Sequence, residues 1–214
     1  MQQLAQKGID RRVTKEERDD LKRATLVRRK TKEDQSKEIT LEDFNILMVI
    51  GRGTFGKVFL AELSTDKKLY AIKSIRKDVL IKFDQVENTI LEKDIMFECD
   101  HPFLVGMEYL FQNDLRLYFV MPFVRGGELY KVFQSMKRFK EETVVFYAAQ
   151  MAIAIGYLHS KGIVHRDLKL ENVLVDQDGY LKIIDYGLAK ILDEDQEATS
   201  FCGTPEYLAP EMVT

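Results

Sequence analysis

The chain has 214 residues, of which 45% are hydrophobic and 31% are charged, with 32 Lys and Arg against 35 Asp and Glu. This length allows one domain of ordinary size or two small ones, and the near-balanced charge gives no electrostatic reason to expect nucleic acid as a partner. Only two cysteines occur, Cys99 and Cys202, which excludes a disulfide framework and a cysteine-based zinc site and favours a cytoplasmic location. No apolar run is long enough for a signal sequence or a transmembrane segment.

Residues 1–40 differ in composition from the rest of the chain. They carry twelve Lys and Arg against eight Asp and Glu, so this part is basic while the remainder is acidic. Their apolar residues are few and include Leu4, Ile9, Val13, Leu21, Leu26 and Val27. Because such sparse apolar positions do not make a buried helical face, we interpret residues 1–41 as a charged, solvated extension that is helical or partly disordered.

From residue 41 onward, apolar runs alternate with turn residues, and this pattern predicts an α+β fold in two lobes. Helical periodicity predicts a helix at 85–97, with Val86, Ile90 and Met96 on one side. The second half of the chain is mainly helical. The strands are predicted at 44–50, 57–63, 68–73, 105–111 and 116–121, with two short ones at 173–175 and 181–184, and the later helices at 128–134 and 142–160.

A glycine-rich segment joins the first two predicted strands and reads GRGTFGKV over 51–58. Alone, a G-x-G-x-x-G pattern is weak evidence, because dinucleotide-binding folds and plain tight turns also contain it. Here a strand follows the glycines instead of a helix, which argues against a dinucleotide-binding fold. A glycine-rich hairpin can place backbone N–H groups over phosphates, since no Cβ atom keeps the chain at a distance.

Four further motifs follow in a fixed order. AIK ends at Lys73 in the third predicted strand, HRDLKLEN covers 165–172, DYG covers 185–187 and GTPEYLAPE covers 203–211. Five independent patterns in this order make a chance match negligible, and residues 42–214 resemble a eukaryotic serine/threonine protein kinase.

Three shorter segments narrow the resemblance to the AGC group, which contains the cyclic-nucleotide-dependent kinases, protein kinase C and the protein kinase B relatives. These segments are FYAAQ at 146–150, YLH at 157–159 and FCGTPEY at 201–207. The resemblance implies a bilobal kinase fold. Its N-lobe at 42–121 has a five-stranded antiparallel sheet and the helix called αC, and a hinge with a partial, mainly helical C-lobe occupies 122–214.

The resemblance also implies the catalytic roles. Lys73 contacts the α and β phosphates of ATP and pairs with Glu92 of the αC helix. Asp167 accepts or orients the substrate hydroxyl, and Lys169 lies near the transferred phosphate. Mg²⁺ is held by two residues, Asn172 and Asp185.

For the nucleotide, the resemblance implies an apolar stack around the purine and a hinge that reads adenine through backbone groups alone. Pro122 lacks an N–H group, but the contact implied at this position is made by a carbonyl, which proline keeps. The implied ATP-binding residues are Ile50, Gly51, Gly53, Gly56, Val58, Ala71, Lys73, Met121, Pro122, Val124 and Leu174.

Protein or peptide substrates are the implied partners. Glu128 and Glu171 match positions that bind basic residues before the acceptor Ser or Thr, and a carboxylate meets a guanidinium in a strong, directional contact. Leu208 matches the wall of the apolar pocket for the residue after the acceptor. Two segments of the extension, RRVT at 11–14 and KRATL at 22–26, fit the same pattern, so they are candidates for cis substrates or for inhibitory occupants of the cleft.

An activation switch is expected at Ser200, where the family carries its phosphorylated residue, with the adjacent Thr199 as an alternative. An upstream kinase would add the phosphate. Arg166 and Lys190 would bind it and order the loop, because a phosphate carries about −1.5 to −2 charges.

Two departures from the family pattern affect these expectations. Tyr186 replaces the usual Phe of the DFG motif, so its hydroxyl needs a hydrogen-bond partner when buried. The chain given ends at Thr214, soon after the last motif. The alternative to an active kinase is therefore a catalytically impaired fragment that binds nucleotide or protein.

Overall fold

The computed structural model describes residues 13–29, 39–192 and 202–212, and these residues form two compact units. The first unit comprises Met1–Phe83 and Glu108–Phe123, and the second comprises Asp84–Met107 and Val124–Thr214. The helix expected as αC therefore groups with the second unit. The functional boundaries at 41/42 and 121/122 remain a prediction.

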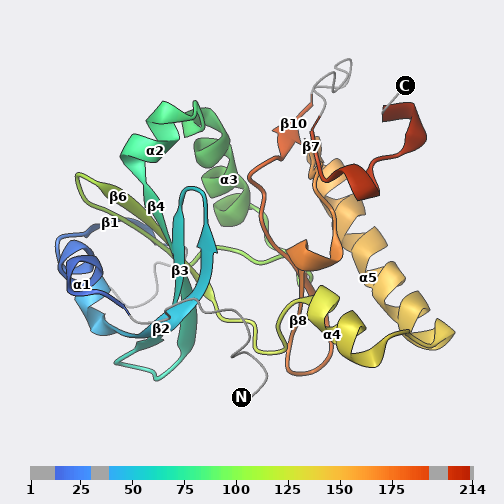
Figure 1. Cartoon of the computed structure of the whole chain (residues 1–214), viewed down its shortest axis with the longest axis horizontal. Coiled ribbons are helices and arrows are strands. Elements are labelled where there is room, and N and C mark those ends of the chain that lie inside the picture. The colour runs from blue at the N-terminus through green and yellow to red at the C-terminus, as the bar shows by residue number, and fades with distance from the viewer. Residues whose placement is uncertain (1–12, 30–38, 193–201, 213–214) are drawn as a thin grey trace. The chain divides into compact units, whose positions relative to one another are not determined.

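The first unit is built on an antiparallel six-stranded sheet with the strand order β1-β5-β6-β4-β3-β2 (Figure 1). The five strands expected from the sequence are confirmed, and a short helix, α2 (Lys77–Lys82), follows the third of them. The strands are β1 (Thr25–Arg29), β2 (Phe44–Gly53), β3 (Gly56–Leu63), β4 (Leu69–Arg76), β5 (Tyr109–Gln112) and β6 (Arg116–Pro122).

The sixth strand corrects the interpretation of the N-terminal extension. Helix α1 (Lys15–Lys22) and strand β1 pack on the sheet, and β1 pairs with β5. Leu21 and Ala24 are only 4% and 8% exposed and join the same core cluster as the sheet residues. For residues 13–29, the expectation of a solvated extension is wrong, because few but well-placed apolar residues are buried here.

The hydrophobic core of this unit lies on one face of the sheet. Since neighbouring residues of a strand point to opposite faces, the register assigns Phe59 and Ile72 to the core face and Val58 and Lys73 to the other. The burial follows this division: Phe59 and Ile72 are buried, whereas Val58 and Lys73 are only partly covered.

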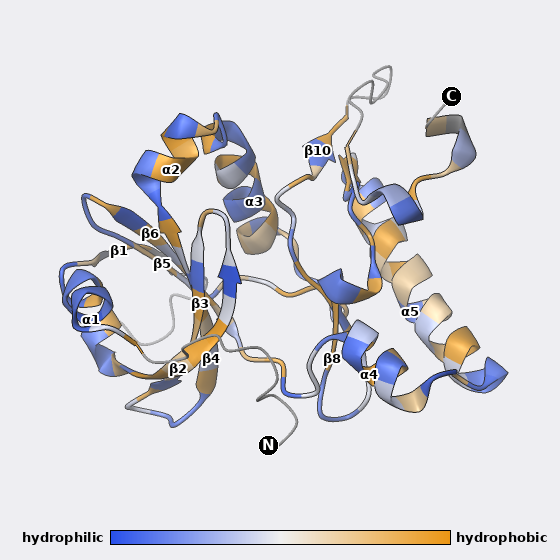
Figure 2. Ribbon diagram, in the orientation of Figure 1, coloured by the Kyte–Doolittle hydropathy of each residue, from blue (hydrophilic) through white to orange (hydrophobic). Residues whose placement is uncertain are grey.

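The second unit is mainly helical, as expected, and its longest helix, α5, carries a hydrophobic middle (Figure 2). In α3 the predicted apolar side is only partly right: Met96 is buried as expected, but Val86 and Ile90 are half exposed and the charged Glu92 is buried. The helices are α3 (Val86–Glu98), α4 (Leu129–Met136) and α5 (Glu141–His159), and two short antiparallel pairs join β7 (Ile163–Val164) to β10 (Lys190–Ile191) and β8 (Val173–Val175) to β9 (Leu181–Ile183). Within the described ranges, no helix is both long and apolar enough to cross a bilayer.

Candidate active site

The glycine-rich segment forms a tight hairpin between β2 and β3. Gly53 pairs with Gly56, which leaves a two-residue turn. A Cβ atom at Gly56 would lie 1.8 Å from the carbonyl oxygen of Ser74, so this position accepts only glycine. At Gly53, by contrast, a Cβ atom would meet nothing within 4 Å. The glycines thus serve two purposes, close strand packing at Gly56 and an open backbone at Gly53.

The apolar residues expected around the purine gather on the sheet face opposite the core. Val58 pairs with Lys73, and Ala71 pairs with Met121, so these four side chains share one face. Ile50 lies where the β2–β3 register shifts, and it is 41% exposed. Nine of the expected ATP-binding residues lie in the first unit, on this hairpin or on strands β2, β3, β4 and β6. They are Ile50, Gly51, Gly53, Gly56, Val58, Ala71, Lys73, Met121 and Pro122.

In the second unit, a web of hydrogen bonds surrounds the carboxylate of Asp167. Lys169 Nζ lies 2.8 Å from Oδ2, and Asn172 Nδ2 donates to the same oxygen at 2.9 Å. Thr204 donates its hydroxyl proton to Oδ1 at 2.7 Å. Burial raises the pKa of Asp167, but the hydrogen bonds from Lys169 and Thr204 outweigh burial and hold that pKa below its ordinary value of 3.8. The carboxylate is therefore ionised at neutral pH.

Thr204 is a site residue that the sequence reasoning missed. Its hydroxyl also accepts a hydrogen bond from Lys169 Nζ at 2.9 Å, so it bridges the two expected catalytic side chains. Thr204 lies in the GTPEYLAPE motif, and this position was the feature of the sequence that could have marked it as a candidate site residue. Nearby, Gly203 has a φ of 114° and packs against the Arg166 carbonyl oxygen, which brings the two segments together.

The two expected metal ligands are joined through the backbone. The N–H of Ile184, next to Asp185, donates to the carbonyl oxygen of Asn172 at 2.9 Å. Asp185 has a left-handed φ of 64° and accepts a long hydrogen bond from the N–H of Gly187 at 3.4 Å. The Asn172 side chain uses its amide nitrogen for Asp167, so its amide oxygen is the atom left to face a cation.

The donors present fit Mg²⁺, which prefers hard oxygen ligands and shares its coordination sphere with phosphates and water. Asn172 and Asp185 supply an amide and a carboxylate oxygen. No cluster of three or more His, Cys, Asp or Glu that could hold a metal occurs among the residues whose placement is described. Two protein ligands suit a metal that completes its sphere with a nucleotide.

His165 and Tyr186 form the buried support of this loop. Nδ1 of His165 accepts from the Asp167 N–H at 3.3 Å, so Nε2 carries the proton that is donated to the Ile184 carbonyl at 3.2 Å. Burial lowers the pKa of His165 below 6.5, which keeps the ring neutral at pH 7. The hydroxyl of Tyr186 donates to the Ile183 carbonyl at 3.3 Å, so the expected need for a partner is met.

Arg166 has an unusual position beside this web. Its φ is 65°, its Nε donates to the Leu188 carbonyl at 2.6 Å, and its buried Nη1 has no hydrogen-bond partner among the described residues. Lys190, the other expected phosphate ligand, lies on β10, which pairs with β7 just before His165. Ser200 and Thr199 lie outside the described residues.

The expected substrate-binding residues lie in three segments of the second unit. Glu171 lies two positions after Lys169, and its buried Oε2 has no hydrogen-bond partner among the residues that the structure describes. Glu128 precedes α4, forms an antiparallel bridge with Leu174 and pairs with Lys131 at 2.6 Å. Leu208 is partly buried near Gly203.

The expected site thus divides between the two units. The hairpin, Lys73 and the strand residues belong to the first unit, whereas Glu92, Val124 and Leu174 belong to the second, together with the Asp167 web. Within the second unit the structure brings Asp167, Lys169 and Asn172 into direct contact. The pairing of Lys73 with Glu92 remains a prediction.

The open glycine hairpin and the strand lysine of the first unit, together with the ionised Asp167 held by Lys169 and Asn172 in the second, are features of the protein kinase class. The protein kinase domain family matches residues 44–214, and the chain belongs to this family. Among its relatives are serine/threonine kinases of the AGC group, to which the chain also belongs.

The fruit fly Drosophila melanogaster has a RAC serine/threonine-protein kinase that is 48% identical over 178 residues, covering 83% of this chain and 29% of that protein. A protein kinase C-like 2 of Schizosaccharomyces pombe is 46% identical over 183 residues, covering 84% of this chain and 18% of the relative. The human RAC-beta serine/threonine-protein kinase is 44% identical over 177 residues, with coverages of 82% and 37%. The chain therefore spans well under half the length of these relatives.

Proposed function

We propose that the protein is a serine/threonine kinase that transfers the γ-phosphate of MgATP to Ser or Thr hydroxyls, preferably those preceded by basic residues. The observation that carries this proposal is the ionised Asp167 held by Lys169, Asn172 and Thr204. Phosphoryl transfer depends mainly on positioning and electrostatic stabilisation, and this web supplies both for an incoming hydroxyl.

In this proposal Asp167 and the other expected site residues have distinct roles. Asp167 accepts a hydrogen bond from the substrate hydroxyl and thereby orients the hydroxyl oxygen toward the γ-phosphorus atom of ATP. Lys169 balances the negative charge near the transferred group, and Lys73 binds the α and β phosphates with support from Glu92. When bound, Mg²⁺ neutralises charge on the phosphate oxygens, and Asn172 with Asp185 would hold it.

The nucleotide would lie on the partly covered face of the first sheet. Val58 and Ala71 share that face with Lys73 and Met121, which supports an apolar site for the purine next to a cation for the phosphates. Val124 and Leu174 belong to the second unit, and their contact with the purine remains a prediction, as does the reading of adenine by the backbone of Pro122.

A preference for basic residues before the acceptor rests on Glu171 and Glu128. A buried carboxylate oxygen without a partner is costly unless a ligand satisfies it, and Glu171 Oε2 is such an atom. A guanidinium from a peptide substrate would donate to it in a charge-assisted hydrogen bond. Leu208 then forms part of the pocket for the residue after the acceptor.

Activation by an upstream kinase at Ser200 is supported by the unsatisfied Nη1 of Arg166. A phosphate oxygen would satisfy that nitrogen, with Lys190 as a second cation. The cytoplasmic location stays a prediction. It rests on the two cysteines, Cys99 and Cys202, which are both free thiols in the structure.

The proposal is tested with purified chain, γ-labelled MgATP and two peptides that differ only in Arg or Ala before a central Thr. We expect labelling of the Arg peptide at a kcat/KM at least about tenfold above that of the Ala peptide. Glu171→Gln should reduce this ratio toward one, whereas the exposed Glu142→Gln should leave it unchanged. Equal labelling of both peptides by the unaltered chain would remove the basic preference, and no labelling of either would contradict the kinase activity itself.

A further inference from the structure

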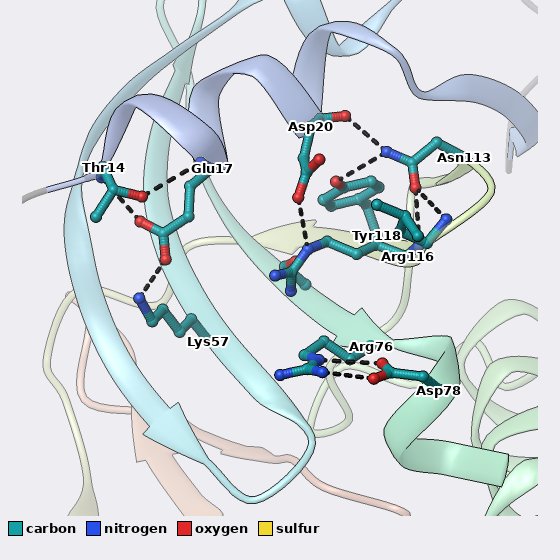
Figure 3. Close-up of polar contacts among 11 residues, drawn as sticks. Thr14, Glu17, Asp20, Lys57, Arg76, Asp78, Asn113, Arg116 and Tyr118 are labelled. Carbon is teal, nitrogen blue, oxygen red and sulfur yellow. Dashed lines mark hydrogen bonds and ion pairs between the residues drawn. The ribbon is translucent and has the colours of Figure 1, made fainter.

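The family match begins at residue 44, so helix α1 and strand β1 lie outside the part of the chain that the family describes. We call residues 13–29 the docking segment. Two carboxylates of α1, Glu17 and Asp20, are buried although they belong to a mainly hydrophilic helix. They are three residues apart and so lie on one helix face. Buried carboxylates need partners, and each has a cation on a different strand of the sheet (Figure 3).

Asp20 fixes the helix to β6. Its carboxylate pairs with Arg116 Nε at 3.0 Å, and its carbonyl oxygen accepts from Asn113 Nδ2 at 2.7 Å. Arg116 in turn donates to the Ser74 hydroxyl at 3.4 Å. These contacts, with the buried Leu21, hold α1 on the sheet without any help from Glu17.

Glu17 connects the docked helix to the glycine-rich hairpin. One carboxylate oxygen accepts from the Thr14 backbone N–H at 2.9 Å, which completes a capping box, and the other pairs with Lys57 Nζ. The Glu17 side chain is 10% exposed and that of Lys57 is 28% exposed. Burial raises the pKa of Glu17, but the hydrogen bonds from Lys57 and Thr14 prevail and lower it. The ion pair is therefore formed at neutral pH.

Lys57 is well placed to transmit this contact. It directly follows Gly56, pairs across the hairpin with Arg52 and pairs on its other side with Ser74. Because strand residues alternate between faces, the Lys57 side chain points to the core face, where α1 lies, while Val58 points to the face with Lys73. The hairpin is thus held from the face opposite the proposed phosphate site.

We propose that Glu17 is a positioning residue that holds the glycine-rich hairpin in place for nucleotide binding through its ion pair with Lys57. A glycine-rich hairpin is intrinsically mobile, and restraining it before binding reduces the ordering that the nucleotide must impose. The consequence for ATP rests on the proposed function, whereas the restraint on the hairpin does not.

The test compares the unaltered chain with Glu17→Gln and with Glu16→Gln as the matched control. Glutamine keeps an oxygen for the Thr14 N–H but loses the charge that Lys57 meets. Glu16 is an exposed neighbour in the same helical turn. Two quantities are measured: hydrogen exchange of the amides at 51–58 without nucleotide, and the Kd for MgATP by calorimetry.

For Glu17→Gln we expect exchange of the hairpin amides and the Kd for MgATP to rise about fivefold, with exchange in α5 unchanged. Lys57→Met, which leaves the capping box intact, should give the same result if Glu17→Gln does not fold. The double variant Glu17→Lys with Lys57→Glu restores an ion pair but loses the acceptor for the Thr14 N–H, so it should recover both quantities part of the way toward the unaltered values.

The outcomes separate the two proposals. Unchanged hairpin exchange in both Glu17→Gln and Lys57→Met would overturn the positioning role. Equal changes in Glu17→Gln and Glu16→Gln would also overturn it, because a general charge effect would then explain them. If the unaltered chain binds no MgATP, the proposed function fails, and hairpin exchange alone still decides the role of Glu17.

Discussion

The hydroxyl of Thr204 donates a hydrogen bond of 2.7 Å to Oδ1 of Asp167, from a segment 37 residues further along the chain. The same hydroxyl accepts from Lys169 at 2.9 Å. Asp167 thereby receives donors on both carboxylate oxygens, and its orientation is fixed by two separate segments. The segment that would contact the substrate next to the acceptor is thus tied to the proposed catalytic aspartate.

Thr204→Val should weaken catalysis because it removes this donor while keeping the side-chain volume. One lost hydrogen bond to a charged group corresponds to a fall in kcat of about tenfold. The pKa of Asp167 should rise toward its ordinary value, so activity should begin to fall at a higher pH as the solution is acidified. Thr204→Ser, which keeps the hydroxyl, is the control. A pH–rate profile identical in Thr204→Val and Thr204→Ser would contradict the role of the hydroxyl.

Leu21→Ala should destabilise the first unit, since Leu21 is 4% exposed in the core cluster beneath α1. Deletion of a buried leucine side chain costs about 2–4 kcal/mol of unfolding free energy. Val27→Ala in the same docking segment changes a residue that is 48% exposed, and it should cost less than about 0.5 kcal/mol. Urea unfolding of both variants measures the difference. Equal, small losses would indicate that residues 13–29 are solvated after all.

The contrast between the motifs and the docking segment shows what the sequence could predict. Strand alternation and five motifs in order identified the five expected strands and the kinase resemblance, because short-range periodicity and special backbone needs such as Gly56 are local properties. The docking segment is held by few apolar side chains and by two buried carboxylates. In a sequence, Glu17 and Asp20 count as solvated charges, and only the tertiary partners Lys57 and Arg116 make their burial favourable.

The same limit explains the errors within the second unit. In α3 the apolar residues Val86 and Ile90 are half exposed while Met96 and Glu92 are buried, so periodicity alone located the buried side of this helix only in part. Thr204 was missed for a different reason. Its place in the GTPEYLAPE motif is visible in the sequence, but only the fold shows that its hydroxyl reaches Asp167.

Tyr186→Phe should be nearly neutral for stability. The Tyr186 hydroxyl donates to the Ile183 carbonyl at 3.3 Å, but that carbonyl also accepts from the Val105 N–H at 2.9 Å. The carbonyl therefore keeps one partner when the hydroxyl is removed, and we expect a loss of about 0.5–1 kcal/mol at most. Thermal unfolding followed by circular dichroism measures this. A loss above about 3 kcal/mol would mean that the hydroxyl has a further buried role.

Arg166→Ala should abolish the effect of phosphorylation at Ser200. In the unaltered chain, phosphatase treatment should lower kcat about tenfold, as expected for the loss of charge-assisted hydrogen bonds to a phosphate. In Arg166→Ala the activity should be low before treatment and unchanged by it, because the unsatisfied Nη1 that would bind the phosphate is gone.

Ser200→Ala separates the two candidate phosphorylation sites. We expect it to match the phosphatase-treated chain, with mass spectrometry reporting the state of Thr199. Full activity of Ser200→Ala with an unmodified Thr199 would place the switch elsewhere.

The measurement that tests the central claim most directly is γ-phosphate transfer by Asp167→Asn, compared with its affinity for MgATP. Asparagine keeps the size of the side chain but removes the charge that Lys169 and Thr204 contact. A kinase centred on Asp167 should lose at least about 100-fold in kcat, while the Kd for MgATP stays within about twofold of the unaltered value. Transfer at the unaltered rate by Asp167→Asn would contradict the account. MgATP binding without transfer in the unaltered chain would also contradict it, and would favour a nucleotide-binding module in its place.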